Sequence, residues 1–465
     1  MKKPRPIRAS IPAAAVRPSA IAIAAALALA SCSSSAGGGH ATSPSSVTSG
    51  TGGAVKASGC PKGTARGATS STVTAAVSVI NLSIGSLNNS TYGIPSVKDQ
   101  ETDWNLVADD INKSGGAGCR KVEIKFYPVN PGDAAGAQRV CLNIAAAHPY
   151  MVLDSGALTE AGYGNCIPAH KIALASEYLT QDELKKYHPY YLQIGAIPED
   201  TIRTGTLGLK QLGYFGPAKN FKKIGVLYHT CAGSLIAAQR AALSEAGVAS
   251  SNIVTYSLGC PSTEDTPAAL EQAVLSFKNA GVSAVTALEI TDFGVFTQIA
   301  KQQNFKPQYL FAENDIPTTS ATKSANSPNP SNFDGAVDVL GGGYGEQTTP
   351  GFQPTAGTLK CNAIFSAAGK PDVYKQADGY GGLVCDYLWF FQALLNHTPQ
   401  LSSDSLAGAM KSVGTVDFSY PLAPIDFSAA PAGSAYGVSY WRAADYHASC
   451  NCWQVPDPTF HKPFA

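Results

Sequence analysis

Short apolar runs alternate with amphipathic stretches along the chain from about residue 76. Most of the runs lack polar alternation, which is typical of strands buried on both faces of a parallel sheet. Each run is followed by a turn, a stretch with helical spacing and the next run, which is the order found in α/β folds. The expected strands cover residues 76–82, 122–129, 150–154, 172–176, 190–195, 224–229, 253–258, 284–290, 309–312 and 336–340.

Two of the stretches between strands show helical spacing clearly. In the first, an apolar stripe is formed by Trp104, Val107, Ala108 and Ile111. The acidic residues expected on its water-facing side are Asp103, Asp109 and Asp110. The second helix begins after an N-cap at Thr266, and its stripe is formed by Leu270, Ala273, Val274 and Phe277. Ten strands are more than one sheet usually contains. We therefore predict an α/β fold with two doubly wound parallel-sheet lobes.

The amino terminus indicates export. Five basic residues precede an apolar run at 19–30, which is shorter than the roughly 20 residues needed to span a bilayer and is typical of a secretory signal. Leu29, Ala30 and Ser31 directly before Cys32 resemble the bacterial lipobox, in which the cysteine receives a diacylglycerol. We therefore expect a lipoprotein signal peptide at 1–31 and lipidation at Cys32. An ordinary cleavage site beside an incidental cysteine is the alternative.

Composition and charge argue against some classes of binding partner. Charged residues make up 14% of the chain, against about a quarter in typical domains. Of the 33 basic residues, five lie in the first 31 positions, so the rest carries 28 basic against 33 acidic residues. This mildly acidic balance argues against a nucleic-acid partner. Residues 32–72 are rich in Ser, Gly, Ala and Thr, which predicts a flexible tether to the membrane lipid anchor.

The chain contains 11 cysteines. With Cys32 lipidated, the remaining even number favours disulfides in an oxidising compartment. We predict nearest-neighbour pairing, most clearly for Cys231 with Cys260, because each follows a predicted strand. A bridge between Cys450 and Cys452 is the open case, because a CxC ring is strained. Paired CxxC motifs are absent, so no metal site is predicted. The disulfide candidates are Cys60, Cys119, Cys141, Cys166, Cys231, Cys260, Cys361, Cys385, Cys450 and Cys452.

Several segments resemble one family in the same order along the chain, over about residues 75–445. They are ADDINKSGG at 108–116 before KVEIKF at 121–126, NPGDA at 130–134, AKQQNF at 300–305 before YLFAE at 309–313, and PIDF at 424–427. The chain is similar in these segments to type I periplasmic binding proteins of the leucine/isoleucine/valine-binding class. The resemblance implies an extracytoplasmic substrate-binding lipoprotein that hands a small solute, such as an amino acid, to an ABC permease, with no cofactor.

The same resemblance implies two lobes joined by three crossings near 195–201, 334–344 and 413–427. Lobe 1 would comprise residues 73–198 plus 340–415, and lobe 2 residues 199–339 plus 416–465. Ligands of such folds lie at the carboxyl ends of parallel strands, where loop amides and helix N-termini converge. We therefore expect the solute between the two lobes.

The ligand contacts are carried over from the family position by position. In lobe 1, the implied contacts are Tyr92, Ser155, Gly156, Ala157, Tyr178 and Thr180. The loop amides and the Thr180 hydroxyl would hold a carboxylate, and Glu313 would meet an ammonium. Residues 289–292, ending at Asp292, would form the rest of the lobe 2 wall.

Each implied contact also has a structural reading. Glu313 can be a solvated loop acid, Tyr92 and Tyr178 can be surface aromatics, and Thr180 can cap a helix. The sequence departs from the family in two places: Ala157 replaces a usual hydroxyl, and an aromatic residue expected near 230–232 is missing.

The sequence offers no catalytic residue. It lacks a phosphate-binding loop, an HExxH zinc motif and a GxSxG nucleophile motif. We therefore expect a binding protein and not an enzyme. A sensor lobe of the same fold that signals to a partner, and a lipoprotein hydrolase with an unrecognised site, are the alternatives.

The lipobox yields a direct test. Changing Cys32 to Ala removes the acylated thiol, so the protein should leave the membrane fraction and enter the aqueous phase of a detergent partition. A Cys32→Ala protein that still partitions with the detergent would contradict lipid anchoring.

Overall fold

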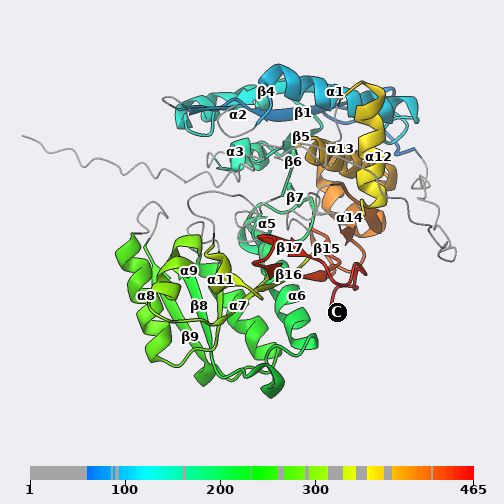
Figure 1. The fold of residues 1–465 in the computed structure, drawn as a ribbon. Helices are drawn as coiled ribbons and strands as arrows, with labels where there is room; N and C mark the ends of the chain where they lie inside the picture. The colour runs from blue at the N-terminus through cyan, green and yellow to red at the C-terminus, as the bar shows by residue number, and fades with distance from the viewer. Residues whose placement is uncertain are drawn as a thin grey trace, which may run out of the picture.

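The computed structural model describes residues 60–84, 87–89, 94–160, 164–177, 179–230, 232–259, 266–288, 293–312, 328–341, 353–370, 380–419 and 423–464. These residues form two α/β lobes (Figure 1). Lobe 1 combines the blue-to-teal part of the chain up to β7 with the helices coloured yellow and orange, whereas lobe 2 combines the green part with the red strands β16 and β17. The predicted fold class, α/β with two parallel-sheet lobes, is confirmed.

The lobe 1 sheet has five parallel strands in the order β4-β1-β5-β6-β7. They are β1 (Thr72–Ile80), β4 (Lys121–Val129), β5 (Met151–Asp154), β6 (Ala173–Ser176) and β7 (Tyr191–Gln193). A short hairpin of β2 (Ser83–Ile84) and β3 (Leu87–Asn88) follows β1. The strands β5 and β6 are buried throughout, as their continuous apolar sequences predict.

Helices from two distant parts of the chain cover this sheet. The first part supplies α1 (Val97–Lys113), α2 (Ala134–Ala147), α3 (Ala157–Glu160), α4 (Cys166–Ala169) and α5 (Gln181–Lys186). The second supplies α12 (Ala356–Ala367), α13 (Tyr380–His397) and α14 (Leu406–Val413). All four residues of the predicted α1 stripe are buried, and the Trp104 Nε1 donates to the Tyr380 hydroxyl at 3.0 Å. The hydrophobic core of lobe 1 therefore needs both parts of the chain.

The lobe 2 sheet has seven strands in the order β17-β16-β12-β11-β10-β8-β9. Five are parallel: β8 (Ile224–His229), β9 (Ile253–Leu258), β10 (Ala284–Leu288), β11 (Gln308–Phe311) and β12 (Val337–Leu340). The last two strands, β16 (Arg442–His447) and β17 (Cys452–Gln454) at one end of the sheet, are antiparallel and were not predicted. The helices are α6 (Pro198–Gln211), α7 (Gly233–Glu245), α8 (Pro267–Asn279), α9 (Phe293–Gln302) and α11 (Pro330–Phe333). Each of the ten predicted strands overlaps a strand of one of the two sheets.

The chain passes between the lobes after β7, after β12 and after a third, small sheet. That sheet consists of β13 (Thr415–Asp417), β14 (Pro424–Asp426) and β15 (Val438–Ser439). Its apolar residues, such as Phe427 and Tyr436, pack in the core of lobe 1. The third passage therefore lies between β15 and β16, later than the predicted 413–427, and lobe 2 does not begin at 416. The pattern of apolar and polar residues in these three short strands does not indicate which lobe's hydrophobic core they pack against.

One predicted surface residue is buried. Asp103 on α1 is 4% exposed and forms an ion pair with Lys370, which follows α12. Burial raises the pKa of Asp103, and the Lys370 ammonium partly offsets that effect. The prediction that Asp103 faces water is wrong, because the second set of lobe 1 helices covers that side of α1.

Four disulfides lie within the described residues. They join Cys60 to Cys119, Cys141 to Cys166, Cys361 to Cys385 and Cys450 to Cys452. Nearest-neighbour pairing is confirmed for these eight residues, including the CxC bridge that the sequence left open. Cys32, Cys231 and Cys260 lie outside the described residues, so their assignments stay predictions.

The disulfides predict resistance to thiol labelling. Alkylation in denaturant without a reductant should modify none of the eight bridged cysteines. Reduction should then lower the free energy of unfolding by about 3 kcal/mol for each of the bridges that span 25 and 24 residues, because it frees the unfolded chain. Mass spectrometry of the alkylated protein and denaturant unfolding check both statements. Extensive labelling before reduction would contradict them.

Candidate functional site

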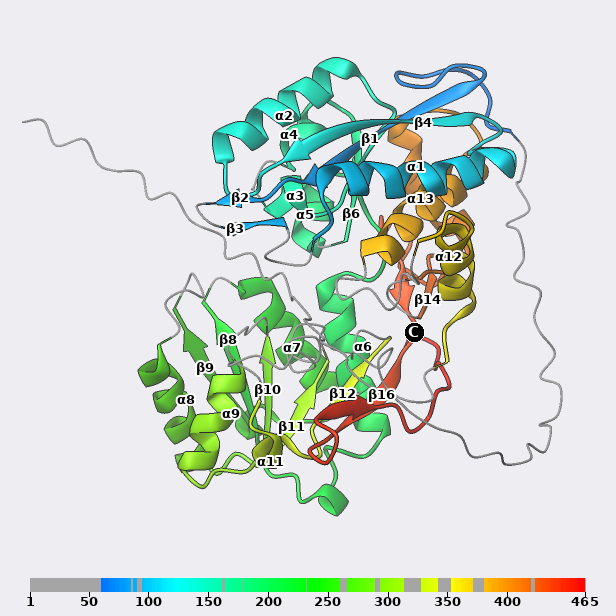
Figure 2. The ribbon, with the colours of Figure 1, turned by 45° about the horizontal axis from the view of Figure 1, so that its top comes forward.

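The carboxyl ends of the parallel strands in each lobe lie on the side toward the other lobe. In lobe 1, β7 leads into α6 of lobe 2 within a few residues, and the other strands run parallel to β7. In lobe 2, the chain leaves the carboxyl end of β12 on its way back to α12 of lobe 1. Figure 2 shows the two lobes facing each other in this way. This arrangement places the loops expected to bind ligand between the lobes.

A row of polar side chains crosses the carboxyl edge of the lobe 1 sheet. Ser78 pairs in register with Asp154, and Ser176 pairs with Gln193. The pairing of β5 with β6 brings Asp154 and Ser176 side by side as well. All four side chains are at most 1% exposed. We call these four residues the polar row.

Asp154 organises the loop after β5. Its carboxylate accepts hydrogen bonds from the Ser78 hydroxyl and from the Leu158 amide, the latter at 3.0 Å. The Ser155 hydroxyl donates to the Ser78 carbonyl oxygen at 2.7 Å and therefore points back to β1. Gly156 has a φ of 95°, which a residue with a side chain rarely adopts. The hydrogen bonds of Asp154 and Ser155 and the backbone conformation of Gly156 thus fix the turn between β5 and α3.

Thr180 caps α5. Its hydroxyl accepts from the Glu183 amide at 3.4 Å and donates to the Glu183 carboxylate at 2.9 Å. The Thr180 amide also donates to that carboxylate, which completes a capping box. Thr180 therefore acts as a helix cap in this structure. Its hydroxyl could donate to a ligand carboxylate only by giving up its hydrogen bond to the Glu183 carboxylate.

Glu177 is an acidic residue at this edge that the sequence analysis did not single out. It follows the last residue of β6 and is partly buried. Within the described residues its carboxylate makes no hydrogen bond or ion pair, and burial raises its pKa from 4.5 to about 8. Glu313 was carried over from the family resemblance, which assigned no role to Glu177. The position of Glu177 directly after a parallel strand is the sequence signal that could have found it.

Contacts between the lobes cluster around the first passage. The Gln181 amide of lobe 1 donates to both carboxylate oxygens of Glu199 on α6, at 3.3 Å each. The Tyr436 hydroxyl donates to Asp200, the next residue of α6. The first turn of α6 is thus bonded to two elements of lobe 1.

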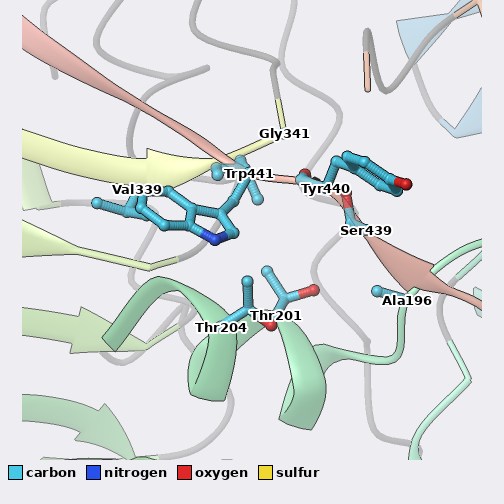
Figure 3. Close-up of a pocket in the computed structure, with 9 residues that line it drawn as sticks. Ala196, Thr201, Thr204, Val339, Gly341, Ser439, Tyr440 and Trp441 are labelled. Atoms are coloured by element: carbon cyan, nitrogen blue, oxygen red, sulfur yellow. Dashed lines mark hydrogen bonds between the residues drawn. The ribbon is translucent and has the colours of Figure 1, made fainter. Parts of the chain in front are cut away.

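A small pocket lies where the three passages meet (Figure 3). Thr201 and Thr204 of α6 point toward Trp441 across it, and Gly341 closes another side. A Cβ atom at Gly341 would lie 2.8 Å from the Ser439 Oγ, so only glycine allows the second and third passages to approach this closely. The pocket thus lies between the three segments that connect the lobes.

The other predicted ligand contacts are not placed. Tyr92, Tyr178, Asp292 and Glu313 lie outside the described residues. Among the described residues, every helix is too short or too polar to cross a membrane. In the same part of the chain, no three His, Cys, Asp or Glu side chains gather as a metal site requires.

Sequence comparisons identify no relative: no protein-family model matches the chain, and no curated protein matches it. Solved structures do match. An ABC transporter substrate-binding protein from Desulfitobacterium hafniense, in complex with Leu, is 12% identical with a TM-score of 0.55 and covers 83% of this chain and 99% of its own. The branched-chain amino acid substrate-binding protein LivJ from Streptococcus pneumoniae, in complex with isoleucine, is 15% identical with a TM-score of 0.54, covering 84% and 100%.

A fatty acid ABC transporter substrate-binding protein from Thermomonospora curvata is 14% identical with a TM-score of 0.54 and covers 86% of this chain and 95% of its own. At such identities the likeness shows the fold. The chain thus has the type I periplasmic binding protein fold, as the sequence resemblance predicted.

The raised pKa of Glu177 predicts a pH-dependent stability. Because the folded pKa lies above the unfolded value, the wild-type protein loses stability as the pH rises from about 4.5 to about 8. Glu177→Gln cannot ionise, so it should match the wild type near pH 4 and exceed it by about 2 kcal/mol near pH 9, allowing for the solvated part of the side chain. Urea unfolding at both pH values measures this difference.

Glu271→Gln on the exposed side of α8 is the matched control, and it should show no such gain at high pH. A Glu177→Gln effect that is the same at both pH values would contradict the raised pKa.

Proposed function

We propose that the protein is an extracytoplasmic solute-binding lipoprotein that delivers an amino acid or a related compound to an ABC importer. The observation that carries the proposal is the pair of lobes joined by three passages, whose parallel strands end toward each other. Two α/β lobes of this kind can close over a small molecule by bending at the passages. The structural neighbours, whose names describe substrate-binding proteins of ABC transporters, support the same role.

The solute would be held by groups from both lobes. Main-chain amides of Ser155, Gly156 and Ala157 would meet a carboxylate, because the Asp154 bonds fix the turn that presents them. Glu313, with Asp292 on the same wall, would meet an ammonium from lobe 2. Tyr92 and Tyr178 would cover the apolar part of the solute, and Thr180 would contribute after exchanging its bond with Glu183.

The anchor and the partner follow from the same role. Lipidated Cys32 and the tether at 32–72 would hold the domain near the membrane surface, where an ABC permease receives the solute. Several acyl chains on one cysteine suffice for stable anchoring, whereas one chain does not.

Mass spectrometry of what co-purifies with the protein tests the role directly. Calorimetry against leucine, isoleucine, lysine, glutamate and a fatty acid then tests the solute class. Binding of none of these compounds, with turnover of an ester or amide substrate instead, would favour a hydrolase over a transport protein.

Glu313→Gln should weaken binding of an amino-acid solute more than tenfold. A micromolar dissociation constant corresponds to about 8 kcal/mol, and loss of a buried charged contact costs about 2 to 5 kcal/mol. Glu271→Gln, exposed on α8, should leave the dissociation constant unchanged. Calorimetry measures both variants. A wild-type protein that binds only solutes without a positive charge would remove the role of Glu313.

A further inference from the structure

Gln193, the last residue of β7, is 1% exposed and uses both ends of its side-chain amide on main-chain groups. Its Oε1 accepts from the Leu179 amide at 2.9 Å, and its Nε2 donates to the Glu177 carbonyl oxygen. The loop after β6 is therefore held on both sides of position 178. No sequence motif pointed to this residue.

The same side chain also holds the first passage. The Gln193 Nε2 donates to the Ala196 carbonyl oxygen at 3.0 Å, midway between β7 and α6. One amide thus bonds a loop of the lobe 1 edge and the chain segment that leaves for lobe 2. A buried amide with these partners cannot move without leaving main-chain groups unpaired.

The segment that leads into the third passage is tied to the same point. The main-chain amide of Gln193 donates to the Ala435 carbonyl oxygen at 2.8 Å, and the main-chain amide of Gly437 donates to the Gly195 carbonyl oxygen at 2.9 Å. Residues 193–195 and 435–437 therefore run side by side as a hydrogen-bonded pair next to β15. A bend of the first passage that moves the Ala196 carbonyl away from β7 would break its bond to Gln193.

We propose that Gln193 is a positioning residue that couples the loop after β6 to the first and third passages, so that lobe movement and the lobe 1 ligand loop change together. This inference deepens the proposed function and rests on it, because the loop after β6 carries Tyr178 and Thr180, two of the predicted ligand contacts of lobe 1. Coupling of this kind needs a physical element that both ends bias. The Gln193 side chain bonds the loop after β6 and Ala196 in the first passage, and the Gln193 main-chain amide bonds Ala435 ahead of the third passage.

Hydrogen–deuterium exchange of the ligand-free protein tests the proposal without a solute. In Gln193→Met, which keeps the length of the side chain but not its hydrogen bonds, the Leu179 amide should exchange at least about tenfold faster. The Gly437 amide should accelerate by a similar factor, although the Gln193 side chain does not bond it. Faster exchange at Leu179 alone would overturn the proposed coupling, because Gln193 would then hold only the loop after β6.

Gln100→Met is the matched control. Gln100 is a buried glutamine of the same lobe whose side chain bonds the Ile80 amide at 2.9 Å, the Ile80 carbonyl at 2.7 Å and the Pro95 carbonyl at 2.8 Å, away from the passages. Its loss should leave the Leu179 and Gly437 amides at wild-type rates. Equal acceleration in both variants would reduce the effect to general destabilisation and overturn the proposal.

A measurement on the wild type covers the case in which Gln193→Met does not fold. Under increasing urea below the unfolding transition, the Leu179 and Gly437 amides should share one opening free energy and one urea dependence, as members of one cooperative unit do. Opening in separate units would overturn the proposal. All these outcomes can be obtained whether or not any solute binds, so a failure of the proposed function is separate from a failure of this inference.

Discussion

The structure depends on how the main-chain and side-chain polar groups at the carboxyl edge of the lobe 1 sheet are satisfied. Strands of a parallel sheet hydrogen-bond each other up to their last paired residues, and the main-chain groups beyond that point must find other partners or water. In this protein the polar row lies at this end of β1, β5, β6 and β7, and its four side chains are buried. Asp154 and Gln193 each bond the loop that follows a strand. The edge of the sheet therefore fixes the start of each of these two loops.

Close approach of the passages is the second requirement, and glycine meets it. Gly205 on α6 lies against β11 and β12, where a Cβ atom would be 2.6 Å from the Val339 carbonyl oxygen. Gly341 allows the second passage to meet the third, as the distance to Ser439 shows. A side chain at either position would push lobe elements apart near the hinge. Gly341 consequently lets the second and third passages lie side by side, although they are far apart in sequence.

The sequence predicted the repeating part of the fold well. Strand positions, the α1 and α8 stripes and three of the disulfides follow from local patterns, because apolar spacing and the order of cysteines are themselves local. The strands β16 and β17, the small sheet and the burial of Asp103 were missed, since each depends on which distant segment covers it. Thr180 shows the same limit at the site: a threonine before Gln-Asp-Glu fits a ligand contact and a capping box alike, and only the Glu183 bonds distinguish them. Gln193 could not be found from sequence because its partners come from three loops.

The scaffold itself does not choose the solute, since proteins of this fold are named for amino acids and for fatty acids. In lobe 1 the side chains of Ser155, Asp154 and Gln193 form hydrogen bonds within the lobe, so the contacts proposed there are loop amides, and the Glu177 carboxyl lies at the same edge of the sheet. Amides attract an anion, and a desolvated carboxyl accepts a cation or keeps its proton. If Glu313 faces the same solute from lobe 2 as proposed, two carboxyls would share one enclosed space, and like charges there require a cation between them or a proton on one. A solute that carries both a carboxylate and an ammonium satisfies the amides and the carboxyls together, which a fatty acid does not.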